Sequence, residues 1–144
     1  MPTTDLRVQR TQAALKAAFR TLALKYPRYR DITVKELTSV ANVNRKTFYL
    51  HFDTIDDLAE TFVEEGANNI LALIDPQDFK QTIAQPGLIF DRLVAYFRQS
   101  EAFNRVILLN DDYSFLSRKI QTAVADGLTA TIQASYHLSA VDAK

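Results

Sequence analysis

One stretch of the chain, TVKELTSVANVNRKTFYLHF, places two helix starts on either side of a single turn signal. Thr33 and Glu36 have capping-box spacing, in which the hydroxyl caps the helix and the carboxylate reaches back to the start. Asn42 is one of the few non-glycine residues that enters the left-handed region cheaply, so it can end that helix sharply. Asn44 is a good N-cap for a second helix over 45–51. Two short helices joined by a tight turn indicate a helix-turn-helix.

The rest of the chain also favours helices, and we expect an all-α fold. Gly 3 and Pro 4 are both low, and no strand-like alternation persists anywhere. Thr54 caps a long helix, with Asp56 and Asp57 in its first turn. Apolar residues at helical spacing predict the remaining helices, with a loop near Gln85-Pro86-Gly87. The expected ranges outside the opening stretch are 4–25, 55–74, 88–100, 102–110 and 113–137.

These helices group into three parts of the chain. We predict a helix-turn-helix domain over 1–53, a connecting helix over 54–74, and a helical regulatory and dimerisation domain over 75–144.

Composition narrows the class of protein. A chain of 144 residues that is 47% hydrophobic and 24% charged has the profile of a soluble globular protein. The lack of cysteine excludes disulfides, thiolate zinc sites and cysteine nucleophiles. No apolar run approaches the roughly 18–20 residues that cross a bilayer, and MPTTDLRVQRTQ has no apolar signal core. We expect a cytoplasmic protein with no membrane partner, no metal and no cofactor.

The formal net charge of zero hides an uneven distribution. Residues 1–52 hold ten Lys and Arg against three acids, a net charge of +7. Residues 53–144 hold seven against fourteen, a net charge of −7. The basic part is the candidate for a polyanionic partner. By charge alone, basic residues that merely solvate exposed helix faces explain the pattern equally well.

The second short helix has the side chains that a DNA major groove requires. Phe48 is expected to face the core, which turns Arg45, Lys46, Tyr49 and His51 outward. Arginine and lysine bind guanine edges, and hydroxyls, lysine and histidine bind phosphates. Tyr49 can stack on sugar and thymine or donate its hydroxyl to phosphate. This composition predicts double-stranded DNA as the partner.

The start of the preceding helix is a second candidate contact. Thr33 and Lys35 lie where a helix offers free N–H groups and the positive end of its dipole to a phosphate. The alternative is that Thr33 only caps the helix.

The segment TVKELTSVANVNRKTFYLHFDTIDDL closely resembles the DNA-binding region of the tetracycline-repressor (TetR) family, over about residues 6–65. The resemblance implies base or groove contacts by Arg45, Lys46 and Tyr49, and structural roles for Val43, Phe48 and Phe52. It implies phosphate contacts by Thr33, Thr47 and His51. The full expected DNA-binding set is Thr33, Lys35, Asn44, Arg45, Lys46, Thr47, Tyr49 and His51.

The chain departs from the family pattern at three positions. Asn42 replaces a usual glycine, and Ile55 replaces a common lysine that reaches phosphate. Lys46 stands where many relatives have a small residue, and our hypothesis is that it compensates for the lysine missing at position 55.

The resemblance also implies how such a protein works. A homodimer would bind a palindromic operator, usually as a repressor and in some relatives as an activator. A small effector in the C-terminal domain would swing the fourth helix and change the spacing of the two recognition helices. Family members usually continue into further dimerisation helices, so this chain is either naturally short or truncated. Without those helices, dimerisation would use 113–137.

An effector pocket is the least specified expectation. Aromatic side chains at helical spacing are more often ordinary core than a ligand site. The candidate lining is Phe79, Tyr96, Phe97, Phe103, Asn110, Tyr113 and Phe115.

Two other classes of function compete with DNA binding. An enzyme is disfavoured because His51 and His137 are the only histidines and no phosphate loop or nucleophile elbow occurs. The acid pairs Glu64-Glu65 and Asp111-Asp112 are sequence neighbours, which point in different directions on a helix. A helical protein-interaction module is disfavoured by the charge of the basic part.

Overall fold

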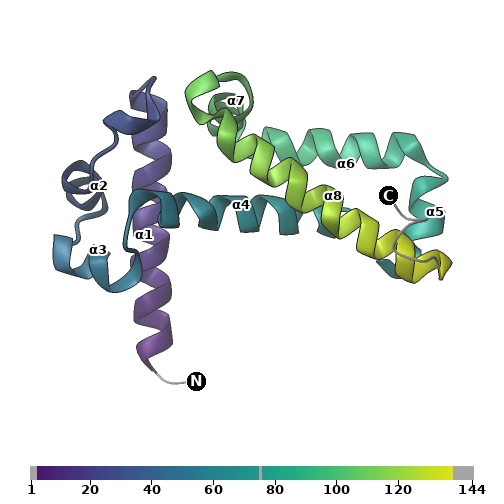
Figure 1. Cartoon of the computed structure of the whole chain (residues 1–144), viewed down its shortest axis with the longest axis horizontal. Helices are drawn as coiled ribbons and strands as arrows, with labels where there is room; N and C mark the ends of the chain where they lie inside the picture. Colours follow the sequence, from purple (N-terminus) through teal and green to yellow (C-terminus); the bar gives the residue numbers. More distant parts are fainter. Residues whose placement is uncertain (1–2, 75, 138–144) are drawn as a thin grey trace.

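The computed structural model describes residues 3–74 and 76–137, and every regular element in that part of the chain is helical (Figure 1). The all-α prediction is therefore confirmed for the described residues. The α-helices are α1 (Thr3–Lys25), α2 (Val34–Ala41), α3 (Arg45–His51), α4 (Ile55–Ala72), α5 (Phe79–Ile83), α6 (Pro86–Arg98), α7 (Glu101–Leu109) and α8 (Ser114–Tyr136). Short 3₁₀ turns occur at η1 (Tyr29–Asp31), η2 (Pro76–Asp78) and η3 (Asp111–Tyr113).

The segment between the expected helices 55–74 and 88–100 is not a loop throughout. It contains η2 and the five-residue α5, whose Phe79 and Thr82 are buried. The loop expected near Gln85-Pro86-Gly87 is wrong in part, because Pro86 and Gly87 are the first residues of α6, where a proline is well tolerated. The Phe79 ring lies 6.3 Å from that of Tyr136 at the far end of α8. A helix of barely more than one turn has too few residues to show a hydrophobic period, so the sequence pattern did not reveal it.

The first three helices pack together at one end of the molecule, with α2 and α3 on one side of α1 (Figure 1). Leu15 and Phe19 of α1, Leu37 of α2 and Phe48 of α3 meet there without exposed surface. Asn42 between α2 and α3 has φ 55° and ψ 44°, as its turn role predicts. Local capping chemistry therefore produces the tight connection that brings α3 against α1.

The cap of α2 differs from expectation in one bond. The Thr33 hydroxyl accepts from the Glu36 N–H at 3.2 Å, as predicted. The Glu36 carboxylate accepts from the hydroxyls of Thr33 and Tyr26, whereas the capping box places it on the backbone N–H of the N-cap residue. The complete capping box is at the start of α4, between Thr54 and Asp57.

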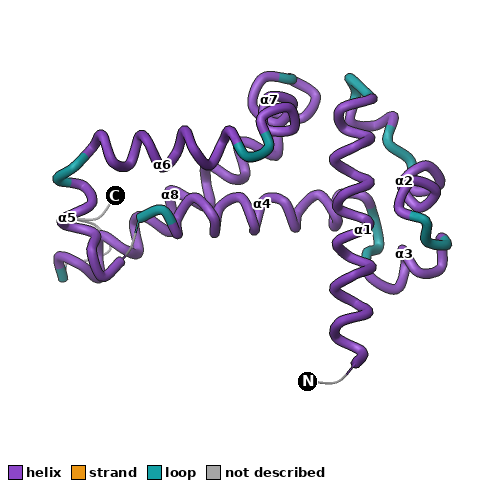
Figure 2. Tube along the Cα trace, turned by 180° about the vertical axis from the view of Figure 1, so that it is seen from behind, coloured by secondary structure: helices purple, strands orange, loops and turns teal. Residues whose placement is uncertain are grey.

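Helix α4 leads away from the first three helices, and α8 lies along it (Figures 1 and 2). Two glycines permit this close approach. A Cβ on Gly127 of α8 would lie 2.4 Å from Leu71 of α4, and a Cβ on Gly66 of α4 would lie 3.1 Å from Ile120 of α8. Helices α6 and α7 complete this half of the molecule.

A single cluster of buried side chains runs from α1 to α8, through α2, α3, α4 and α7. Phe62 of α4 links the two groups of helices, because its ring lies 5.0 Å from that of Phe19 in α1 and 5.4 Å from that of Phe103 in α7. The predicted domain boundaries near residues 53 and 75 remain predictions.

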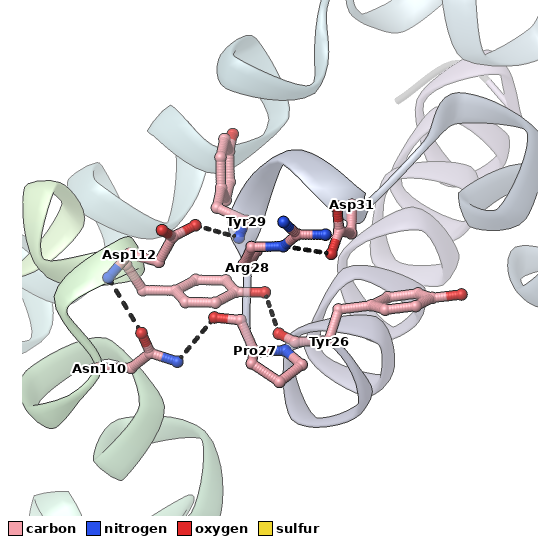
Figure 3. A network of polar contacts seen from close by, with 8 residues as sticks. Tyr26, Pro27, Arg28, Tyr29, Asp31, Asn110 and Asp112 are labelled. Atoms are coloured by element: carbon pink, nitrogen blue, oxygen red, sulfur yellow. Dashed lines mark hydrogen bonds and ion pairs between the residues drawn. The ribbon is translucent and has the colours of Figure 1, made fainter.

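A polar junction joins the loop after α1 to the turn between α7 and α8 (Figure 3). We use this name for Tyr26, Pro27 and Tyr29 together with Asn110, Asp112 and Tyr113. Tyr113 donates its hydroxyl to the Tyr26 carbonyl at 2.8 Å, and Asn110 donates its side-chain N–H to the Pro27 carbonyl at 2.9 Å. The Tyr29 N–H donates to Asp112 Oδ2 at 2.6 Å. Three backbone groups of one loop are thus bound by three side chains of a single short turn, residues 110–113, far along the chain.

Candidate nucleic-acid interface

Helix α3 presents one buried face and one exposed face. Phe48 is fully buried and packs its ring 5.9 Å from that of Phe52, which ends the helix. Arg45, Lys46 and Tyr49 are exposed. The Tyr49 ring meets the Phe48 ring edge-on at 5.2 Å, so its direction is set by the core although 49% of it is accessible. The short helix therefore has a fixed rotation about its axis.

At the cap of α3, two of the predicted DNA-contact residues form hydrogen bonds with each other. Asn44 Oδ1 accepts from the Thr47 N–H at 2.7 Å and from the Thr47 hydroxyl at 2.9 Å. The Thr47 hydroxyl therefore donates its proton to Asn44. Toward any further partner, its oxygen can act only as a hydrogen-bond acceptor. Asn44 keeps its side-chain N–H₂ group for an outside acceptor such as phosphate.

The start of α2 offers free backbone donors beside a lysine. The Thr33 hydroxyl caps the Glu36 N–H, and the Leu37 N–H bonds the Thr33 carbonyl, which leaves the first N–H groups of α2 without a partner in the helix. Lys35 lies exposed next to them. This arrangement can accept an anion.

The cations of this surface are not neutralised by neighbouring acids. Within the described part of the chain, Lys35, Arg45 and Lys46 form no ion pair, whereas Lys16 and Arg28 each pair with a carboxylate. His51 ends α3 half-buried, with its ring 6.4 Å from that of Phe52. The predicted set thus supplies three unpaired positive charges on α2 and α3.

Sequence reasoning missed one exposed residue of α3. Leu50 is 74% exposed, more than any other large apolar side chain in the described residues, and Val40 of α2 is 49% exposed. At roughly 100° per residue, Leu50 lies about 200° from Phe48, so helical periodicity could have placed it beside Lys46 on the exposed face. An apolar side chain there can contact a thymine methyl group.

The predicted pocket residues are not brought together in one place. Tyr96 and Phe103 line a cavity of about 260 Å³ between α1, α4, α6, α7 and α8. Phe97 lies instead on an exposed groove of α6, because neighbouring residues of a helix point in different directions. Phe115 packs its ring 4.9 Å from that of Tyr29. The others are bound elsewhere: Phe79 beside Tyr136, and Asn110 and Tyr113 in the polar junction.

Two other kinds of functional feature are absent from residues 3–74 and 76–137. None of the helices there is both long enough and apolar enough to span a bilayer. No group of three or more His, Cys, Asp or Glu side chains gathers in a metal-binding arrangement in the same ranges.

The chain is similar to one protein whose name states a role. No family model matches the chain, and no solved structure matches it. The chain is 33% identical over 88 residues to the "Uncharacterized HTH-type transcriptional regulator YxbF" of Bacillus subtilis (strain 168). The match covers 58% of this chain but only 23% of that protein, so this chain spans a small part of its relative's length.

Proposed function

We propose that the protein is a DNA-binding transcription regulator in which α2 and α3 form a helix-turn-helix and α3 reads the major groove. The observation that carries the proposal is the fixed rotation of α3. Its buried Phe48 anchors the helix in the core, while Arg45, Lys46 and Tyr49 stay exposed. The name of the Bacillus relative, a helix-turn-helix transcription regulator, supports the same role.

The proposed DNA contacts are of two kinds: some read the base sequence, and others position the helix on the duplex. Arg45, Lys46 and Tyr49 face base edges, where a good bidentate contact discriminates between bases by about 1–3 kcal/mol. Thr33, Lys35 and His51 contact phosphates on the flanking backbone, which fixes the register of the helix without reading sequence. The first N–H groups of α2 add donors to one of these phosphates. The role is one of binding, and the expectation that the chain is not an enzyme stays a prediction.

The resemblance to the TetR family supports a finer form of the proposal. The protein would act as a homodimer on a palindromic operator, as a repressor, with an effector that moves α4. Two recognition helices of such a dimer must lie about 34–36 Å apart to meet successive major grooves. Helix α8, which covers the expected dimerisation range, would supply the contact between the two copies.

The experiment is a fluorescence-anisotropy titration of a labelled random-sequence duplex at several salt concentrations. We expect the logarithm of the affinity to fall linearly with the logarithm of salt concentration, by about 0.9 for each phosphate neutralised. Arg45→Ala and Tyr49→Ala should weaken binding, and Arg105→Ala should not. Arg105 is an exposed arginine of α7 whose ion pair with Glu101 is long, at 3.6 Å, so it controls for lost positive charge.

The proposal fails if the wild-type protein does not bind duplex at low salt, or if Arg45→Ala and Arg105→Ala behave alike. Circular dichroism of each variant shows whether its helices are intact, which separates a lost contact from a lost fold. Selection of a preferred operator from a random pool follows, because only sequence preference distinguishes a regulator from a general DNA-coating protein.

A protein partner is the second candidate, and the exposure of Leu50 and Val40 is what favours it. An apolar contact with a protein is weakly dependent on salt, whereas phosphate contacts give a steep slope. Leu50→Ser would weaken a protein contact strongly. On DNA it should cost only the contact with a thymine methyl group.

A further inference from the structure

The cavity of about 260 Å³ lies where the first three helices meet the rest of the molecule. Its lining includes Arg20 of α1, Phe62 and Asn69 of α4, and Phe103 and Asn104 of α7, with Ile120 of α8 on the far wall. Ligand pockets commonly measure roughly 300–1,000 Å³, so this cavity suits a small molecule only.

Arg20 is the only charged side chain of the described lining that has no oppositely charged partner. The lining contains one carboxylate, Glu65, and Lys16 of α1 forms an ion pair with it. Arg20 makes no ion pair or hydrogen bond within the described residues. The guanidinium of Arg20 is therefore the one uncompensated charge in the described lining.

Two aromatic rings hold that guanidinium in place. Its central carbon lies 5.0 Å from the centroid of the Phe62 ring and 5.8 Å from that of the Phe103 ring. Cation–π contacts of this kind use the faces of the group and leave its N–H donors at the edge. Those donors have the geometry that binds a carboxylate by two parallel hydrogen bonds.

The remaining lining is divided between apolar and polar side chains. Ile107 and Leu116 are buried beneath the cavity and, with Ile120, present aliphatic surface. Asn104 donates its side-chain N–H to the Phe97 carbonyl at 2.8 Å, which fixes its orientation and leaves its own oxygen and second N–H for other partners. An apolar body can therefore lie against the aliphatic wall while a polar group lies at the rim.

We propose that this cavity binds a small amphiphilic carboxylate, whose negative group forms hydrogen bonds with Arg20 and whose apolar chain packs on Phe62, Phe103 and Ile120. Three features of the cavity each exclude a different class of ligand: its size, its one uncompensated positive charge and its aliphatic wall. Nucleotides and other polyanions are too large and too charged, cations are repelled, and neutral apolar molecules leave the Arg20 donors unused.

Binding there would bear on the proposed function. Arg20 belongs to α1, which packs directly on α2 and α3, whereas the other lining residues belong to α4 and the elements that follow it. A bound carboxylate would therefore join the two groups of helices through one charge-assisted contact. This regulatory consequence rests on the proposed DNA binding, but the binding of the carboxylate itself does not.

The experiment measures the binding of sodium octanoate and of the neutral octan-1-ol to the full chain by two-dimensional ¹H–¹⁵N NMR. We expect octanoate to bind about tenfold more tightly than octan-1-ol, because a charge-assisted bond at an exposed site adds that order of affinity. The amide signals of Gly66, Asn69 and Asn104 should shift, since these residues line the cavity.

Three variants test whether the positive charge that binds octanoate is that of Arg20. Arg20→Gln should remove about a tenfold share of the octanoate affinity and leave octan-1-ol unaffected. Arg20→Lys, which keeps the charge but loses the planar fork, should give an intermediate affinity and serves as the test if Arg20→Gln does not fold. Arg10→Gln removes an exposed arginine of the same helix outside the cavity and should change neither affinity.

The proposal is overturned if octanoate does not bind, if octanoate and octan-1-ol bind equally, or if Arg10→Gln reduces octanoate binding as much as Arg20→Gln. Duplex binding of the same samples is measured in parallel. A protein that binds duplex but not octanoate contradicts the carboxylate site alone. One that binds octanoate but not duplex contradicts the proposed function and leaves the site intact.

Discussion

We expect the Tyr113 hydroxyl to contribute more to the free energy of unfolding than the hydroxyl of any other tyrosine in the C-terminal half. Tyr113 is fully buried, and its hydroxyl makes the only hydrogen bond that the Tyr26 carbonyl accepts within the described residues. Tyr113→Phe keeps the ring, including its edge-on contact at 5.7 Å with Tyr29. The substitution therefore removes the hydrogen bond and leaves a carbonyl without a partner, with little change in packing.

The size of the effect follows from that carbonyl. A buried acceptor left unpaired costs about 1–3 kcal/mol, and the half-buried position of Tyr26 allows water to recover part of it. We expect the free energy of unfolding to fall by about 1.5 kcal/mol. For a chain of this size, such a loss lowers the melting temperature by roughly 3–6 °C.

Urea denaturation followed by circular dichroism measures the change, with Tyr136→Phe as the matched control. Tyr136 is 43% exposed and its hydroxyl has no hydrogen-bond partner among the described residues, so its loss should change stability by less than about 0.5 kcal/mol. Amide hydrogen exchange gives a second readout. The Tyr29 N–H, which donates to Asp112, should exchange faster in Tyr113→Phe if the polar junction opens as a unit. Equal stability losses in the two variants would refute the reasoning.

Three further predictions test separate parts of the structure. Asn42 has φ 55°, so Asn42→Ala should cost about 1 kcal/mol in urea denaturation, while Asn42→Gly should be neutral or stabilising; equal costs would contradict the left-handed turn. Lys46→Ala should flatten the logarithmic salt dependence of duplex binding by about one ion, because we expect Lys46 to neutralise the phosphate that a lysine at position 55 would otherwise reach; an unchanged slope would refute that compensation. Burial, with the Asp112 and Asp31 carboxylates, raises the pKa of Tyr113 to about 12, so the folded state favours the protonated phenol. That contribution is complete below the unfolded pKa of 10.0 and is lost as pH rises through the folded value, so urea midpoints of the wild-type protein should fall more steeply over this alkaline range than those of Tyr113→Phe.

The elements that local chemistry determines could be predicted from the sequence. Asn42 and Asn44 each act on backbone groups within a few residues, and their turn and cap occur as expected. Thr54 caps α4 for the same reason. These interactions depend on residue type and spacing alone, so an isolated sequence contains them.

The contacts between distant segments could not be predicted. The polar junction joins residues 83 and 87 positions apart, and neither Asn110 nor Tyr113 shows in sequence which backbone carbonyl it will bind. Their residue types alone suggest a ligand pocket instead. The place of Arg20 is equally invisible in the sequence, because only the tertiary structure brings it against Phe62 and Phe103.

The polar junction also determines how the first three helices can move. A group of helices attached to the rest of a protein by one connection can pivot in any direction about that point. Here the chain connection between α3 and α4 is joined by a second directional attachment, the polar junction at residues 26–29, beside the shared apolar cluster. Apolar contacts can slide, whereas hydrogen bonds hold a fixed geometry. The rotation about the line between these two attachments is therefore the one that keeps the three hydrogen bonds, and a displacement of α3 in another direction strains them.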